Sequence, residues 1–144
     1  MADRRSRALV LLGAGGVLVS GYIHYYLYFE GGYRGIAPDE VLGMTISRAF
    51  AINAVAGFLI AWALVCSLRW ERLTVPAAVA GVGFCAATLA AYALSRTVGL
   101  LGFEDDQTST EAVIAIAAEV IGLVSLAWVL VVCAGARRRT TLVT

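Results

Sequence analysis

The sequence predicts an all-α integral membrane protein, a four-helix bundle with both termini in the cytoplasm. This prediction rests on three observations: the composition, four long apolar runs and the placement of the arginines. Of the 144 residues, 60% are hydrophobic and 15% are charged, and the mean hydropathy is +0.83. Soluble domains carry about 45–50% apolar and about 25% charged residues. A small soluble domain has too much surface to hide this apolar fraction, so we expect one transmembrane domain over residues 1–144.

The four apolar runs set the expected spans, at about residues 8–29, 49–68, 75–95 and 112–134. About 20 residues suffice to cross the hydrocarbon of a bilayer. The first run follows a short basic leader and could be part of a secretory signal. It continues for 22 residues and offers only a poor cleavage site at Val19-Ser20-Gly21. We therefore expect it to remain as the first span.

Small residues predict where the first two spans pack. In the first span they share one stripe with the only histidine, at spacings of three and four: Gly13, Gly16, Ser20 and His24. Membrane helices use such stripes for close approach. Asn53, Gly57 and Ala61 share a face of the second span. Pro38, Asp39 and Glu40 predict that an interfacial helix begins near Asp39 and leads into this span.

The third and fourth spans have comparable signals. Thr74 is a plausible N-cap of the third span, whose small residues form the stripe Gly83, Ala87, Ala91 and Ser95. Thr108 and Glu111 fit a capping box before the fourth span. One face of the fourth span carries Ala115, Glu119, Gly122 and Leu126. We expect these faces to point into the bundle.

The arginines predict the orientation. Eight of the eleven lie in the segments that the terminal side of the bundle would carry: Arg4, Arg5, Arg7, Arg69, Arg72, Arg137, Arg138 and Arg139. The opposite side carries Arg34, Arg48 and Arg96 with most of the acids. By the positive-inside rule, both termini are cytoplasmic. This predicts a multi-pass protein of the cell inner (plasma) membrane.

Polar residues at one depth predict a pocket. With a rise of about 1.5 Å per residue, a single layer under the outer surface holds the candidate site residues His24, Asn53, Tyr92, Arg96 and Glu119, with Arg48 at its edge. A charged group in hydrocarbon costs about 2.5–3.5 kcal/mol, so these side chains should face inward. Glu119 could titrate or pair with a cation, with His24, Arg48 or Arg96 as partner. It could equally form a structural ion pair, or be a protonated acid bonded to Asn53, and His24 could simply belong to the aromatic belt.

The sequence lacks the residues that several kinds of functional site require. A metal site usually needs three or four ligands, and one histidine with one embedded glutamate does not supply them, so we expect no metal or other cofactor. Cys66, Cys85 and Cys133 stand singly in apolar runs, which is typical of small buried hydrophobes. No phosphate loop, nucleophile elbow or H-E-x-x-H motif is present, and nothing indicates nucleic acid as a partner.

Four short motifs together carry a resemblance. They are His24 before the Gly32-Tyr33-Arg34 loop, an early Asn53, the run from Ser95 to Leu100 before an acidic loop, and an embedded Glu119. In these the chain resembles a family of small four-span membrane proteins common in high-GC Gram-positive bacteria. The resemblance implies the architecture and a recurring outer polar layer. It implies no reaction and no catalytic residue.

Three functional classes follow from these observations. The leading one is a non-enzymatic accessory or binding module whose outward-facing pocket takes a lipid, a quinone-like headgroup or a partner helix. The alternative is a proton-coupled small transporter that acts as a dimer through Glu119 and His24. A lipid-modifying enzyme with His24 as general base is the least favoured class. Membrane lipids are the expected partners, and a homo-oligomer or larger membrane complex is left open.

Overall fold

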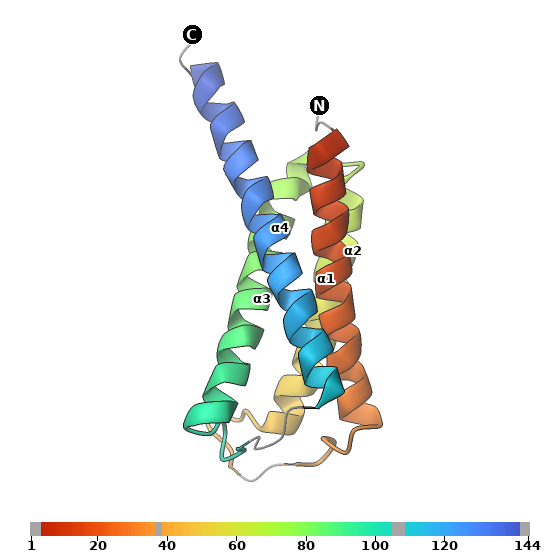
Figure 1. The fold of residues 1–144 in the computed structure, drawn as a ribbon, viewed down its shortest axis with the longest axis vertical. Coiled ribbons are helices and arrows are strands. Elements are labelled where there is room, and N and C mark those ends of the chain that lie inside the picture. Colours follow the sequence, from red (N-terminus) through yellow and green to blue (C-terminus); the bar gives the residue numbers. More distant parts are fainter. Residues whose placement is uncertain (1–3, 37–38, 105–108, 142–144) are drawn as a thin grey trace.

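The computed structural model describes residues 4–36, 39–104 and 109–141 (Figure 1). It contains α1 (Arg4–Phe29), α2 (Ile46–Ser67), the short 3-10 helix η1 (Glu71–Leu73), α3 (Thr74–Thr97) and α4 (Thr110–Thr141). Within these ranges, four helices are long and apolar enough to cross a membrane. The described residues form no strand, only two isolated bridges in the connections. The all-α prediction with four spans is confirmed at this level.

The helices pack side by side in an up-and-down arrangement. Helix α1 lies against both α2 and α4, and α3 closes the group by packing on α4 and α2. The start of α1 and the end of α4 lie at the same end of the molecule (Figure 1). We call this the terminal end, and we call the opposite end, with the α1–α2 and α3–α4 connections, the loop end. Side chains reaching inward near the loop end of all four helices can therefore meet.

Close backbone contacts hold α1 in place, as its glycines predict. A Cβ atom at Gly16 would overlap the carbonyl oxygen of Ala118 and would lie 2.9 Å from the nitrogen of Gly122 in α4. On the α2 side, a Cβ atom at Gly57 would lie 2.7 Å from the Cα atom of Gly21. The predicted stripe of α1 does face α4, whereas the contact of Gly21 with α2 was not anticipated.

The start of α2 differs from the prediction. Residues 39–45 are not helical, so an interfacial helix beginning near Asp39 is wrong; Pro38 lies outside the described residues. The chain instead makes a tight turn in which the N–H groups of Val41 and Met44 donate to each other's carbonyl oxygens, at 3.0 and 2.9 Å. Thr45 then caps α2, because its hydroxyl accepts the backbone N–H of Arg48 at 3.2 Å. A threonine cap thus takes the place of the proline and acidic start signal.

The packing face of α3 also differs. Gly83 and Ala87 are exposed, and a Cβ atom at Gly83 would meet nothing within 4 Å. Ser95, the last residue of the predicted stripe, is buried, but the rest of the buried face carries Ala77, Ala78, Gly81, Phe84, Cys85 and Thr88. Thr74 is the first residue of the helix rather than its cap, and no side chain caps this end. Glycine and alanine occur all around α3, so small size alone does not select its inner face.

Helix α4 presents the predicted face. Ala115, Glu119, Gly122 and Leu126 are all buried. At the start of the helix, the hydroxyl of Ser109 accepts the N–H of Ala112 at 3.1 Å. The expected cap Thr108 lies outside the described residues, so the capping box stays a prediction.

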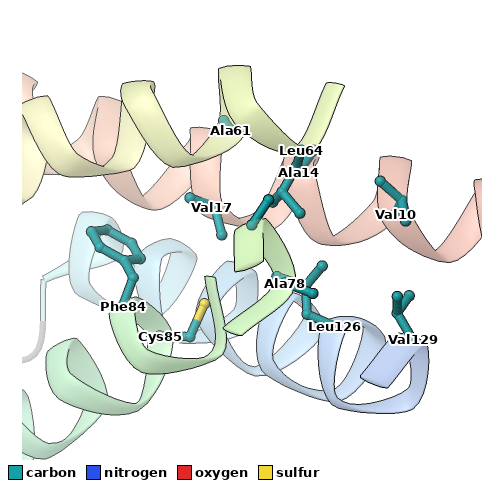
Figure 2. Close-up of a cluster of buried hydrophobic side chains, with 11 residues drawn as sticks. Val10, Ala14, Val17, Ala61, Leu64, Ala78, Phe84, Cys85, Leu126 and Val129 are labelled. Atoms are coloured by element: carbon teal, nitrogen blue, oxygen red, sulfur yellow. The ribbon is translucent and has the colours of Figure 1, made fainter. Parts of the chain in front are cut away.

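The interior of the terminal half is apolar apart from the buried hydroxyls of Ser67 and Ser125. Figure 2 shows aliphatic side chains of α1, α2 and α4 meeting Ala78, Phe84 and Cys85 of α3. Leu64, Leu126 and Val17 are fully buried there. Large apolar side chains such as Trp62 and Trp128 point outward instead, at 70% and 59% exposure, as suits helices that face lipid. The buried acid must be sought on the loop side of this apolar cluster.

Candidate functional site

Glu119 of α4 is the buried acid on which the site centres. Its side chain is 2% exposed. The hydroxyl of Ser20 in α1 donates to Oε1 of the carboxyl at 2.7 Å, and Thr88 of α3, whose hydroxyl donates to the backbone carbonyl oxygen of Phe84, lines the same cavity. Three helices therefore contribute to the environment of this one carboxyl. Hydrogen bonds of this kind offset part of the cost of placing an acid inside a membrane protein.

His24 is linked to the same serine. Its Nδ1 atom lies 2.9 Å from the carbonyl oxygen of Ser20 and 3.5 Å from the Ser20 hydroxyl oxygen. A carbonyl oxygen only accepts, so Nδ1 carries the hydrogen and Nε2 is the remaining ring nitrogen. Ser20 and His24 are four residues apart, which places them on one face of α1. The structure thus lines up His24, Ser20 and Glu119 between α1 and α4.

A partly enclosed cavity of about 110 Å³ adjoins these groups. All four helices line it near the loop end, with Ile23, His24, Leu27, Ile46, Ala49, Phe50, Asn53, Thr88, Ala91, Tyr92, Ser95, Ala112, Ala115, Ile116 and Glu119; Tyr33, Leu100, Phe103 and Ser109 complete the wall. One water needs about 10–15 Å³ by this measure. The cavity therefore has room for a small chemical group.

Aromatic rings form its wall on the loop side. Tyr33 stacks on Phe50 with ring centroids 4.4 Å apart, and Phe103 meets Tyr33 edge-on at 5.6 Å. The ring of His24 lies 5.2 Å from that of Phe50. These contacts join the two connections of the loop end to α1 and α2. The aromatic cluster and the carboxyl of Glu119 thus belong to the wall of the same cavity.

Four of the six residues proposed from the sequence line this one cavity: His24, Asn53, Tyr92 and Glu119. Arg48 and Arg96 are exposed and are not among the lining residues. Arg48 instead donates to the carbonyl oxygen of Gly43 and lies 3.7 Å from the carboxylate of Glu40. A role in ligand binding stays a prediction for all six.

Sequence reasoning missed Ser20 and Thr88 as parts of the site. Ser20 was assigned to helix packing because it continues a glycine stripe, although its spacing of four from His24 was the available signal. Thr88 lies four residues before Tyr92 and seven before Ser95, so the same helical spacing could have found it. The aromatic wall had no such signal, because two of its rings belong to irregular connections.

The described residues do not group as a metal site, since no three His, Cys, Asp or Glu side chains lie together among them. The three cysteines are free thiols; Cys85 is buried, and Cys66 and Cys133 are half-buried. No protein-family model, curated protein or solved structure matches the chain. The family resemblance therefore stays a prediction, and function must be argued from the cavity.

Proposed function

We propose that the chain is a multi-pass protein of the plasma membrane, with its terminal end in the cytoplasm and its loop end outside. The arginine count supports this orientation. The terminal side carries eight arginines and two acids, whereas residues 30–48 and 96–111 carry three arginines and seven acids. Arginines near the ends of spans are retained on the cytoplasmic side. In this orientation the cavity lies under the outer surface.

In this proposal the protein is a non-enzymatic binding module for a small amphipathic ligand, such as a lipid or a molecule with a quinone-like headgroup. The observation that carries the proposal is the buried carboxyl of Glu119 in the wall of a cavity. Polar groups from several helices surround a space of about 110 Å³, which suits a headgroup but is too small for a partner helix about 10–12 Å wide.

Hydrogen bonding argues against a hydrolytic or transfer reaction. The hydroxyls of Ser20, Thr88 and Ser95 donate to the Glu119 carboxyl or to backbone carbonyl oxygens. His24 directs the hydrogen on Nδ1 toward the carbonyl oxygen of Ser20. A nucleophilic hydroxyl needs a base that accepts its proton, and each of these hydroxyls donates its hydrogen elsewhere than to Nε2, the ring nitrogen of His24 that could accept it. This supports binding over catalysis.

Filling the cavity tests the proposal. Ala91 lines the cavity, whereas its neighbour Ala90 is exposed, so Ala91→Phe and Ala90→Phe form a matched pair. Native mass spectrometry of protein extracted in a mild non-ionic detergent should show a bound small molecule in the wild type and in Ala90→Phe. The adduct should be lost from Ala91→Phe. Wild-type protein without any adduct, or an adduct unaffected by Ala91→Phe, would contradict the proposal.

A second candidate is a proton-coupled transporter that works as a dimer. The alignment of His24, Ser20 and Glu119 favours it, because such a chain of groups can pass a proton. The apolar interior of the terminal half argues against it, since a transported charge needs a route to the other side. Solute counterflow in proteoliposomes distinguishes the transporter from the binding module. A transporter should show solute flux in the wild type that is lost in Glu119→Gln, and a binding module should show no flux in either.

A further inference from the structure

The cavity combines one carboxyl with an aromatic wall, and this combination restricts the ligand. Glu119 is the acid among the lining residues, and no arginine of the described chain lines the cavity; the sequence has no lysine. A phosphate or carboxylate in this space would meet the carboxyl of Glu119, and the one basic side chain among the lining residues is His24, whose Nδ1 is engaged with the carbonyl oxygen of Ser20. Like charges at close range in a low dielectric repel strongly.

The wall also suits a positive charge. Phe50, Tyr33, Phe103 and Tyr92 line the space, and the ring of Tyr33 contacts those of both Phe50 and Phe103. Aromatic faces attract ammonium groups and recognise them in cages of several rings. A carboxylate beside such rings adds a charge-assisted hydrogen bond for a primary ammonium.

Charge on the loop end favours the same ligand. Residues 30–48 and 96–111 carry seven acids and three arginines, an excess of four negative charges. Arg48 is already engaged with Glu40 and the carbonyl oxygen of Gly43. A surface with one dominant sign raises the local concentration of ligands of opposite sign. The approach to the cavity and its interior therefore select for the same charge.

We infer that the cavity binds an organic ammonium ion, either a free amine or the headgroup of a lipid, with its charge against Glu119 and its apolar part along the aromatic wall. This inference rests on the proposed binding function and names its ligand class. The space of about 110 Å³ takes the ammonium group and a few carbons, so a longer chain would extend out of the cavity.

Three probes that share a phenyl ring and differ in charge test the inference. They are 2-phenylethylammonium, 2-phenylethanol and 3-phenylpropionate, measured by equilibrium dialysis with the full chain in non-ionic micelles at 150 mM salt. The ammonium should bind at least about tenfold more tightly than the alcohol, a difference of about 1.4 kcal/mol, and the carboxylate should bind more weakly than both. Glu119→Gln should remove the preference for the ammonium, while Glu104→Gln, in the exposed loop, should retain it.

The outcomes separate the inference from the function on which it rests. Equal affinity for all three probes, or a preference for the carboxylate, overturns the ammonium inference and leaves a binding cavity in place. Absence of binding by any probe counts against both. If Glu119→Gln does not fold, the order of the three probe affinities for the wild-type protein still tests the inference. Displacement of the bound amine by phosphatidylethanolamine but not by phosphatidylglycerol would identify a lipid source, and retention with both lipids would identify a free amine.

Discussion

Replacing Gly16 by alanine should destabilise the protein, because the backbones of α1 and α4 touch there. A Cβ atom at this position would overlap the carbonyl oxygen of Ala118 and would lie 3.0 Å from the Cα atom of Gly122. These are backbone atoms and cannot rotate away, so α1 and α4 must separate. Overpacking of this kind costs about 1–3 kcal/mol. Gly15 is the matched control, since a Cβ atom there meets nothing within 4 Å.

The assay is reversible unfolding in mixed micelles, with helix content followed as the fraction of denaturing detergent rises. Gly16→Ala should lower the free energy of unfolding by about 1–3 kcal/mol. Gly15→Ala should leave it unchanged or raise it by up to about 1 kcal/mol, since alanine favours a helix more than glycine does. Equal stability of Gly16→Ala and Gly15→Ala would refute the close contact between α1 and α4.

Three further predictions concern the Ser20–Glu119 hydrogen bond, the contact of α1 with α2, and the orientation in the membrane. Ser20→Ala should lower the free energy of unfolding by about 1–3 kcal/mol, because it leaves the buried Glu119 carboxyl without this hydrogen bond. In a Glu119→Gln background the loss should shrink, and full additivity of the two changes would contradict the pairing. Gly57→Leu should separate α1 from α2 and reduce stability in the same unfolding assay, because a Cβ atom there already lies 2.7 Å from Gly21, while Gly83→Leu on the open face of α3 should not. In a cysteine-free background, Gly32→Cys should react with a membrane-impermeant thiol reagent on intact cells and Arg69→Cys only after permeabilisation; the reverse order would invert the proposed orientation.

The lengths of the apolar runs predicted the four helices because hydrocarbon thickness fixes how many residues a span needs. The observed helices α3 and α4 extend beyond the predicted spans, to Thr97 and Thr141, since a helix need not end where the membrane does. The start of α2 was misplaced because proline and acidic residues also occur in turns. In that segment the glycine at position 43, with φ 78°, favours the turn.

The cavity was predictable in part because charged groups are costly in hydrocarbon. That argument brought His24, Asn53, Tyr92 and Glu119 to one depth, and the structure places all four in the wall of one cavity. The spacing of four places Ser20 on the same face of α1 as His24, but which residue of α4 meets that face depends on how the helices pack, so the bond from Ser20 to Glu119 could not be predicted. Arg48 was proposed on depth alone, and its contacts are within its own connection.

The central claim is that polar side chains of the four helices line a cavity near the loop end, and we expect water to enter it. Asn53 lines the cavity, and Ile52 beside it on α2 is 53% exposed on the outer face of the bundle. The direct measurement is the rate at which a charged, water-soluble thiol reagent modifies Asn53→Cys and Ile52→Cys in cysteine-free protein in lipid bilayers. A cavity predicts rapid modification of Asn53→Cys and protection of Ile52→Cys by lipid. Protection at both positions, or faster reaction of Ile52→Cys, would contradict it.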